Sequence, residues 1–187
     1  MIYKVLKVLR DDLDNELNPQ DPVVLEPVDI VIDNIAREDN DATSVSNKIV
    51  ITLLSVEEEP ALKNSPRYER KQPEDPKGYV QKNPSAYLNL YVMIAANRDN
   101  YEMALKNISK VIETLQTKKV LVNEDEQFRF KAQMHPLPFD QLSYVWGLLG
   151  GKVIPSALYK ISIVKIQKEG SIDPKLIIEI GLETNKE

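Results

Sequence analysis

"AYLNLYVMIAAN", residues 86–97, is apolar on both of its alternating faces. A second segment, "KIVITLLSVEEE" (48–59), has the same character, and it is rich in β-branched residues. Strands of this composition usually lie inside a sheet that is covered on both sides. We therefore predict two central strands. In the second segment the alternation places Ile49, Ile51 and Leu53 on one face and Val50, Leu54 and Val56 on the other.

Two helices are expected from apolar residues at helical spacing. The first runs from Ile2 to Leu17 and should end at the pair Asn18-Pro19. The second should begin at a capping box formed by Asp99 and Glu102. Its expected apolar stripe contains Tyr101, Ala104, Leu105, Ile108, Val111, Ile112 and Leu115. Extended structure is expected over 22–35, and short strands at 119–122 and 128–130.

A third helix should follow Pro138 and stop at Gly150-Gly151, because glycine adopts positive φ without steric cost. Residues 144–161 hold the only tryptophan of the chain. They could form either a reactive loop or a structural corner, and the pattern of a helix, a glycine pair and a strand favours the corner. Trp146 is either a partner anchor or a core residue, and its register with Leu142 and Leu149 favours the core. The predicted corner residues are Trp146, Gly150, Gly151, Pro155 and Tyr159.

Alternating residues at 156–166 and 175–182, joined by the turn "EGSIDP" (169–174), predict a C-terminal hairpin. The expected fold class is α+β, with a mixed sheet flanked by helices. We expect a single domain over residues 1–187.

Composition excludes several classes of protein. The chain has no cysteine and one histidine, His135, so thiolate sites and histidine-based metal centres are not expected. The net charge of -5 argues against general nucleic-acid binding, and no apolar run has the length of a membrane span. The N-terminus lacks the apolar region of a secretion signal. We expect a soluble protein made in a reducing cytosol, with no cofactor.

Residues 60–84 are the main candidate for partner binding. They contain five of the twelve prolines, six Lys or Arg residues and three acidic residues, a local charge of about +3 in an acidic chain. Connections of this length are usually disordered or functional. A linker and an ordered docking arm remain equally open. The residues expected to contact a partner are Lys63, Arg67, Tyr68, Arg70, Lys71 and Lys77.

Catalytic and ligand-binding motifs are weak. Ser143 or Ser156 could be combined with His135 and Asp140, but neither serine lies in a G-x-S-x-G elbow. "DNDATS" (39–44) begins like a calcium loop but lacks the glycine and glutamate of that motif. "GLLGGK" follows a predicted helix, whereas phosphate loops precede one. The residues therefore favour a structural or binding protein over an enzyme.

Five segments, in this order, resemble the N-terminal domain of tail-terminator, or cap, proteins of extracellular contractile injection systems, the phage-tail-like particles typified by the antifeeding prophage. They are "MIYKVLKVLRDDLDNELN" (1–18), "NKIVITLLSVEEEP" (47–60), "NPSAYLNLYVMIAAN" (83–97), "YEMALKNISKVIETLQTK" (101–118) and "WGLLGGKVIPSALYKISIVKI" (146–166). The matching positions are mainly core and corner residues, among them Leu88, Leu90, Trp146, Gly150, Pro155 and Tyr159.

The resemblance implies a tail-terminator-like, largely antiparallel sheet and a non-enzymatic structural role. It implies a homohexameric ring at the baseplate-distal end of the tail, which ends polymerisation of the inner tube and the sheath. The implied partners are other copies of the chain, the sheath protein and the inner-tube protein. Some relatives carry a further C-terminal region, so a longer paralogous cap protein is a further expected partner. Assembly in the bacterial cytoplasm, in a particle that can be released, is implied too. The alternatives are a transient adaptor or assembly chaperone and, more distantly, a hydrolase using Ser156 and His135.

Overall fold

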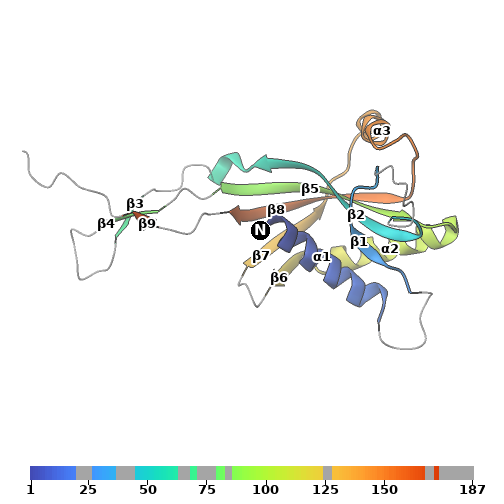
Figure 1. The fold of residues 1–187 in the computed structure, drawn as a ribbon, viewed down its shortest axis with the longest axis horizontal. Helices are drawn as coiled ribbons and strands as arrows, with labels where there is room; N and C mark the ends of the chain where they lie inside the picture. The colour runs from blue at the N-terminus through green and yellow to red at the C-terminus, as the bar shows by residue number, and fades with distance from the viewer. Residues whose placement is uncertain are drawn as a thin grey trace, which may run out of the picture.

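The computed structural model describes residues 1–19, 27–36, 45–62, 68–70, 79–82, 86–123, 128–166 and 171–172. These ranges form three α-helices, one 3₁₀ turn and nine strands (Figure 1). The helices and the turn are α1 (Ile2–Leu17), η1 (Pro60–Leu62), α2 (Tyr101–Thr117) and α3 (Phe139–Leu148). The strands are β1 (Ile30–Ile32), β2 (Lys48–Glu58), β3 (Tyr68–Arg70), β4 (Tyr79–Lys82), β5 (Ala86–Asn97), β6 (Val120–Asn123), β7 (Phe128–Met134), β8 (Ser156–Ile166) and β9 (Ser171–Ile172).

Six strands form one sheet in the order β1-β2-β5-β8-β7-β6. β1 and β2 are parallel, and every other neighbouring pair is antiparallel. The two strands predicted to be central, β2 and β5, pair with each other inside this sheet. The prediction of an α+β fold with a mixed, largely antiparallel sheet is confirmed.

Helices cover the two faces of the sheet unequally. α1 and α2 pack on one face, where Leu9, Leu13 and Val111 join a large apolar core with Ile51 and Ile94 (Figure 1). α3 packs on the other face, where Trp146 contacts a small cluster around Met93 and Ala95. The first face therefore holds most of the buried apolar area, at about 1.5–3 kcal/mol for each fully buried large side chain.

α1 ends where the sequence predicted, at an asparagine. The Asn18 backbone N–H donates to Asp14 O (2.8 Å), and its side-chain amide exchanges two 2.9 Å hydrogen bonds with the backbone of Val28. Extended structure was expected over 22–35. Residues 22–26 lie outside the described residues, and within 27–35 the strand spans only Ile30–Ile32. It stops because the side chains of Asp33 and Asn34 accept hydrogen bonds from the backbone N–H groups of Asn34 and Ala36, which turns the chain.

α2 begins one residue later than its predicted cap. Asn100, rather than Asp99, is the N-cap, and its Oδ1 accepts hydrogen bonds from the N–H groups of Glu102 (2.9 Å) and Met103 (3.4 Å). The predicted apolar stripe is too wide, since Tyr101 and Leu105 are exposed. The buried face instead includes two polar residues, Asn107 and Thr114.

A β-bulge changes the predicted faces of β2. The pairing with β5 shifts between Leu53 and Ser55, so that Leu53 lies opposite Val92 and Val56 lies opposite Leu90. Directly paired residues point to the same face, and Leu90 and Val92 both belong to the core under α1 and α2. Val56 therefore shares a face with Ile51 and Leu53, and the expectation that it shares one with Val50 was wrong. One extra residue in a strand produces this reversal.

Three short strands form a second sheet in the order β3-β4-β9, away from the six-stranded sheet (Figure 1). β3 and β4 belong to the segment 60–84 and pair antiparallel. β9 was expected inside a turn, but Ile172 pairs with Gln81 of β4. The other half of the predicted hairpin, 175–182, lies outside the described residues. Within those residues, no helix is long and apolar enough to cross a bilayer.

Candidate functional site

The connection from α3 to β8 has the backbone geometry of a tight corner. α3 ends at Leu148, and Gly150 and Gly151 follow with φ of +93° and +76°. The N–H of Gly151 donates to Trp146 O at 2.7 Å. Residues with a Cβ rarely adopt positive φ, so the two glycines permit this reversal of the chain.

Two aromatic residues lie buried near this connection, on opposite faces of the sheet. Trp146 is 3% exposed and packs on Met93, while Tyr159 is 3% exposed in the core under α1 and α2. Burial raises the pKa of the Tyr159 phenol above its ordinary value. Between them, Pro155 O accepts a 2.9 Å hydrogen bond from the N–H of Ala96, which fixes the start of β8 against β5.

The outward side of α3 exposes three large apolar residues. Phe139 and Leu148 are each 86% exposed and Tyr144 is 72% exposed, as is Val153 after the helix. Scattered exposed apolar residues are common, but three of them on one short helix make it a candidate contact surface. Trp146 is the only fully buried residue of the helix.

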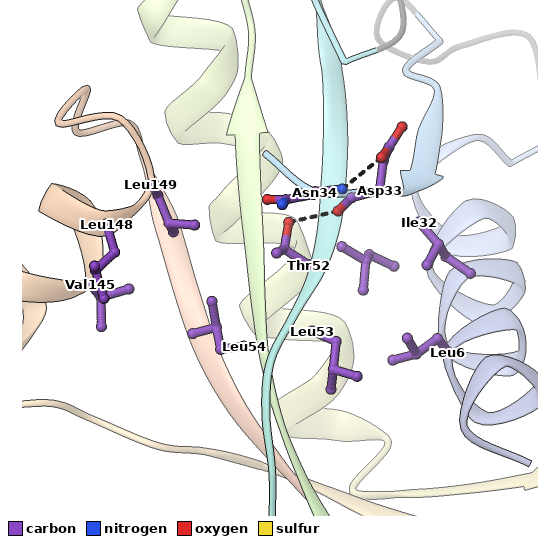
Figure 2. Close-up of a pocket in the computed structure, with 11 residues that line it drawn as sticks. Leu6, Ile32, Asp33, Asn34, Thr52, Leu53, Leu54, Val145, Leu148 and Leu149 are labelled. Atoms are coloured by element: carbon purple, nitrogen blue, oxygen red, sulfur yellow. Dashed lines mark hydrogen bonds between the residues drawn. The ribbon is translucent and has the colours of Figure 1, made fainter. Parts of the chain in front are cut away.

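An apolar cavity of about 480 Å³ lies between α3, the end of β1 and β2 (Figure 2). Val145, Leu148 and Leu149 line it from α3, and Leu53 and Leu54 line it from β2. Its upper rim in this view is polar: Thr52 Oγ1 donates to Asp33 O at 2.8 Å and accepts from the N–H of Ile35 at 3.1 Å. An apolar site of this kind suits an apolar side chain of a partner.

At the opposite end of the sheet, β6 exposes two valines. Val120 and Val122 are 53% and 57% exposed, whereas Leu121 between them is buried. Val120 lies opposite Lys131 and Val122 opposite Arg129 of β7, so the valines and these two cations share one face. Together Val120, Val122, Arg129 and Lys131 form what we call the β6 surface.

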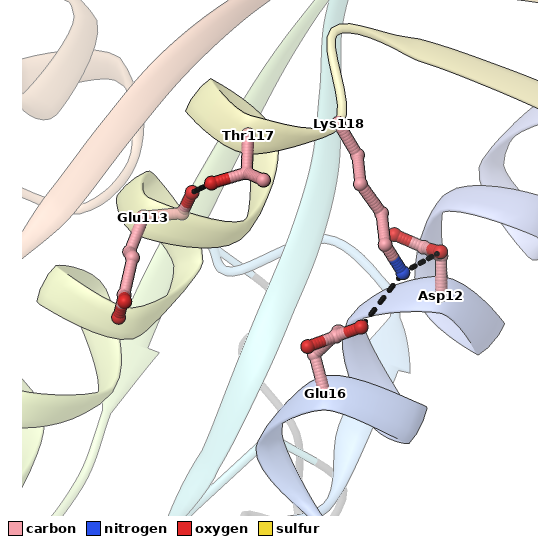
Figure 3. A network of polar contacts seen from close by, with 5 residues as sticks. All are labelled: Asp12, Glu16, Glu113, Thr117 and Lys118. Carbon is pink, nitrogen blue, oxygen red and sulfur yellow. Dashed lines mark hydrogen bonds and ion pairs between the residues drawn. The ribbon is translucent and has the colours of Figure 1, made fainter.

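A polar network joins the C-terminal ends of α1 and α2 (Figure 3). Lys118 Nζ lies 2.7 Å from Glu16 Oε1 and 3.1 Å from Asp12 Oδ1. The hydrogen bond with Glu16 is the main cause that raises the pKa of Lys118, and the same bond lowers the pKa of Glu16. Thr117 donates to the backbone O of Glu113 at 2.9 Å. Lys118 and its two carboxylate partners therefore link α2 to α1, and we call this group the clamp.

The structure does not assemble the candidate catalytic residues. The hydroxyl of Ser143 donates to the backbone O of Asp140 (2.6 Å), and Ser156 begins β8 beside Pro155. The His135 ring packs edge-on against Tyr91, with ring centroids 5.0 Å apart. No hydrogen bond joins a serine to His135 among the described residues. In the same part of the chain, no three His, Asp or Glu side chains gather as metal ligands.

Two of the six predicted partner-binding residues lie in the described part of the chain. Tyr68 and Arg70 begin and end β3, opposite Gln81 and Tyr79 of β4. Lys63, Arg67, Lys71 and Lys77 lie outside the described residues. Their role stays a prediction.

Sequence reasoning missed the cavity and the β6 surface. The signal for the cavity was the pair Asp33-Asn34, which ends β1 early and leaves β2 without a partner beyond Ile51 on that side in the described residues. The signal for β6 was the alternation of Val120, Leu121 and Val122 beside a second short strand that carries cations at every other position.

Comparison with known proteins gives both a family and a fold. The family model "Pvc16 N-terminal domain" matches residues 4–179. No curated protein matches the chain. Two solved structures share the fold. The first is the sheath/tube terminator of an extracellular contractile injection system, PVC, in its extended state, with a TM-score of 0.67 and 15% identity. The second is the tube-terminating cap of the anti-feeding prophage, with a TM-score of 0.62 and 14% identity.

The similarity extends over the whole of this chain but not over the whole of those proteins. It covers 100% and 98% of this chain, which spans 64% of the PVC terminator and 62% of the anti-feeding prophage cap. The resemblance to tail terminators that the five sequence segments indicated is thereby confirmed. The chain belongs to the Pvc16 N-terminal domain family.

Proposed function

We propose that this chain is a structural tail-terminator subunit that forms a hexameric ring at the baseplate-distal end of a contractile injection system. There it ends polymerisation of the inner tube and the sheath. The observation that carries the proposal is the fold match over the full chain to terminators of two such particles. The role needs shape and contact surfaces, and no chemistry.

The proposed partners are other copies of the chain, the sheath protein and the inner-tube protein, together with a longer paralogous cap protein. The chain acts as one terminator domain over 1–187, with 60–84 as an arm. Assembly takes place in the bacterial cytoplasm, and the particle carries the subunit out on release. Each copy offers two different lateral surfaces, because a closed ring is built from head-to-tail contacts.

The first test measures the mass of the purified protein by light scattering, followed by negative-stain imaging. We expect six-fold rings of about six times 21.3 kDa. The same protein should remain at one tip of purified tail particles. A monomer that is absent from finished particles would contradict the proposal and would favour the transient adaptor or assembly chaperone.

Two contact regions follow from the sequence. The arm carries Lys63, Arg67, Arg70 and Lys71, whose positive charge suits an acidic neighbouring surface. Their simultaneous reversal to Glu should lower the yield of capped tails. The matched control reverses Lys7, Lys106, Lys110 and Lys152, which changes the net charge equally but lies on α1, on α2 and after α3. Equal yields from both variants would argue against the arm.

The second contact region is the C-terminal segment, whose strand edge would pair with another chain. β9 pairs with β4, so the segment and the arm form one unit. Deletion of residues 171–187 should therefore impair capping while the six-stranded sheet remains folded, as measured by circular dichroism. Normal capping by the shortened chain would remove this contact.

A further inference from the structure

The six-stranded sheet has one partly open edge at β2. β1 pairs with β2 only from Ile49 to Ile51, and then the chain turns through Asp33 onto Thr52. From Leu53 to Glu57, no strand in the described part of the chain pairs with β2 on this side, while β5 pairs with it on the other. Unpaired backbone N–H and C=O groups along such an edge are a template for another strand.

The opposite edge, β6, is also open in the described part of the chain, where its only strand partner is β7. Natural edge strands are commonly protected by charged side chains on the strand itself. β6 instead exposes Val120 and Val122, and the cations lie one strand further in, at Arg129 and Lys131. Within the described residues these two cations make no ion pair. The β6 edge is therefore suited to burial against another chain.

The two edges are complementary in polarity and in charge. Beside the open part of β2 lies the apolar cavity of about 480 Å³, between Leu54 of β2 and Leu148 of α3 (Figure 2). The same edge carries Glu57 near its end. The β6 surface offers the reverse set, two apolar side chains and two cations. Valines placed beside the cavity would leave water, and cations placed near Glu57 would be attracted to it.

The strand directions are also compatible with pairing between β6 of one copy and β2 of another. β2, β8 and β6 run the same way, because each is separated from the next by one antiparallel neighbour. A second copy placed the same way round would bring its β6 parallel to β2, in line with β1, which is itself parallel to β2. A contact between different surfaces at opposite ends of one sheet is head-to-tail, and it closes into a ring when each step adds a rotation.

We propose that β6 of one copy pairs with the open part of β2, residues 53–57, of the next copy. This assignment rests on the proposed function, because it names the two lateral surfaces that a ring requires. Val120 and Val122 then lie on the face of the sheet that carries α3. Arg129 and Lys131 lie on the same face as Glu57, which is opposite Asn89 and accepts a 2.9 Å hydrogen bond from Tyr91.

Cysteine cross-linking tests this contact, and the chain has no cysteine of its own. Ser55→Cys marks the β2 edge and Val122→Cys marks the β6 edge. Each single variant carries one cysteine, so a mixed dimer of the two variants reports a contact between copies. An equimolar mixture of the single variants, treated with a short bis-maleimide, should give a mixed covalent dimer. The double variant should give a ladder of covalent oligomers.

The matched control replaces Ser55→Cys with Ser109→Cys, which is also exposed but lies on α2, outside both edge strands. It should give at least tenfold less mixed dimer with Val122→Cys. Cross-linking is carried out on the purified protein and on tail particles that contain the variants. Rings or capped tails without the mixed dimer would overturn the edge assignment and leave the terminator proposal intact. A chain that neither forms rings nor remains in particles would overturn both.

A charge exchange gives a second readout. Arg129→Glu with Lys131→Glu should reduce the ring fraction at least tenfold, with unchanged circular dichroism. Adding Glu57→Lys in the same chain should restore part of that fraction, because the two edges regain opposite charges. Full ring formation by the first variant, or no recovery in the second, would overturn the proposed contact.

Discussion

Lys118 and Glu16 lie on different helices and meet at 2.7 Å, so one cation holds the C-terminal ends of α1 and α2 together (Figure 3). α1 carries Asp12, Asp14 and Glu16 towards its C-terminal end and has no basic residue in its last turn. Negative charge at that end opposes the helix dipole. Lys118 compensates it from the neighbouring helix, and it also complements the C-terminal end of α2.

Lys118→Met should lower the free energy of unfolding by about 1 kcal/mol. The value is modest because the ammonium is 43% exposed and screened by water. It is not negligible, because Asp12 Oδ2 is already buried without a partner, and removal of Lys118 leaves two carboxylates close together. Urea denaturation measures the change. Lys119→Met, an exposed neighbour with no ion pair in the described residues, should change stability by less than about 0.5 kcal/mol. Equal losses in both variants would contradict the clamp.

The pH dependence of the clamp follows from the lowered pKa of Glu16. The hydrogen bond from Lys118 is the main cause, so the folded state holds this carboxylate ionised below the ordinary value of 4.5. The stabilisation from Glu16 is therefore present above pH 4.5 and is lost as the pH falls through the folded pKa. Glu16→Gln should be less stable than the parent at pH 7 and should approach it at pH 2–3. A difference that persists unchanged into acid would contradict this account.

The fold could largely be predicted from local pattern, because the long elements are strongly periodic. α1 has leucines at helical spacing that are all buried, and β5 is apolar on both faces and lies inside the sheet. The errors concern features that a single residue decides. The bulge near Leu54 reverses the face of Val56, and the sequence around it shows no turn signal. β9 pairs with β4 across about 90 residues, and no local pattern encodes such a partner.

The candidate surfaces were harder to predict than the fold. β1 ends early because of side-chain to backbone hydrogen bonds at Asp33 and Asn34. Because β1 ends there, the following part of β2 has no strand partner on that side in the described residues, and the cavity lies beside it. In the sequence, Phe139 has helical spacing with Leu142, Val145, Trp146 and Leu149. The structure buries Trp146 and leaves Phe139 in solvent, because α3 meets the sheet over a narrow contact.

The corrected cap of α2 can be tested directly. Asn100→Ala removes the oxygen that accepts from two N–H groups, and it should cost about 1 kcal/mol of the free energy of unfolding. Asp99→Ala should cost only a few tenths, because Asp99 precedes the cap. Chemical denaturation of both variants compares them. A larger loss at Asp99 would reinstate the capping box that the sequence suggested.

The two glycines after α3 should respond differently from the glycine within it. Gly151→Ala places a Cβ at φ +76° and should destabilise by about 1–2 kcal/mol, even though nothing lies within 4 Å of the new atom. Gly147→Ala adds a Cβ to a helical residue with equal space, and it should stabilise by up to about 1 kcal/mol. Thermal unfolding measures both changes. Because the space is the same, only backbone conformation separates the two variants, and similar effects would contradict the corner geometry.

Trp146 should carry most of the energy that attaches α3 to the sheet. Trp146→Ala removes a side chain that is 97% buried and leaves a cavity over Met93 and Ala95, which should cost about 3–5 kcal/mol. Phe139→Ala, in the same helix but 86% exposed, should change stability by less than about 0.5 kcal/mol. Circular dichroism in urea measures both variants. In the parent, the fluorescence of this single tryptophan reports the docking of α3 alone, so a fluorescence transition that precedes the circular dichroism transition would show that α3 detaches before the sheet unfolds. Coincident transitions would show instead that this one buried indole couples α3 to the whole core.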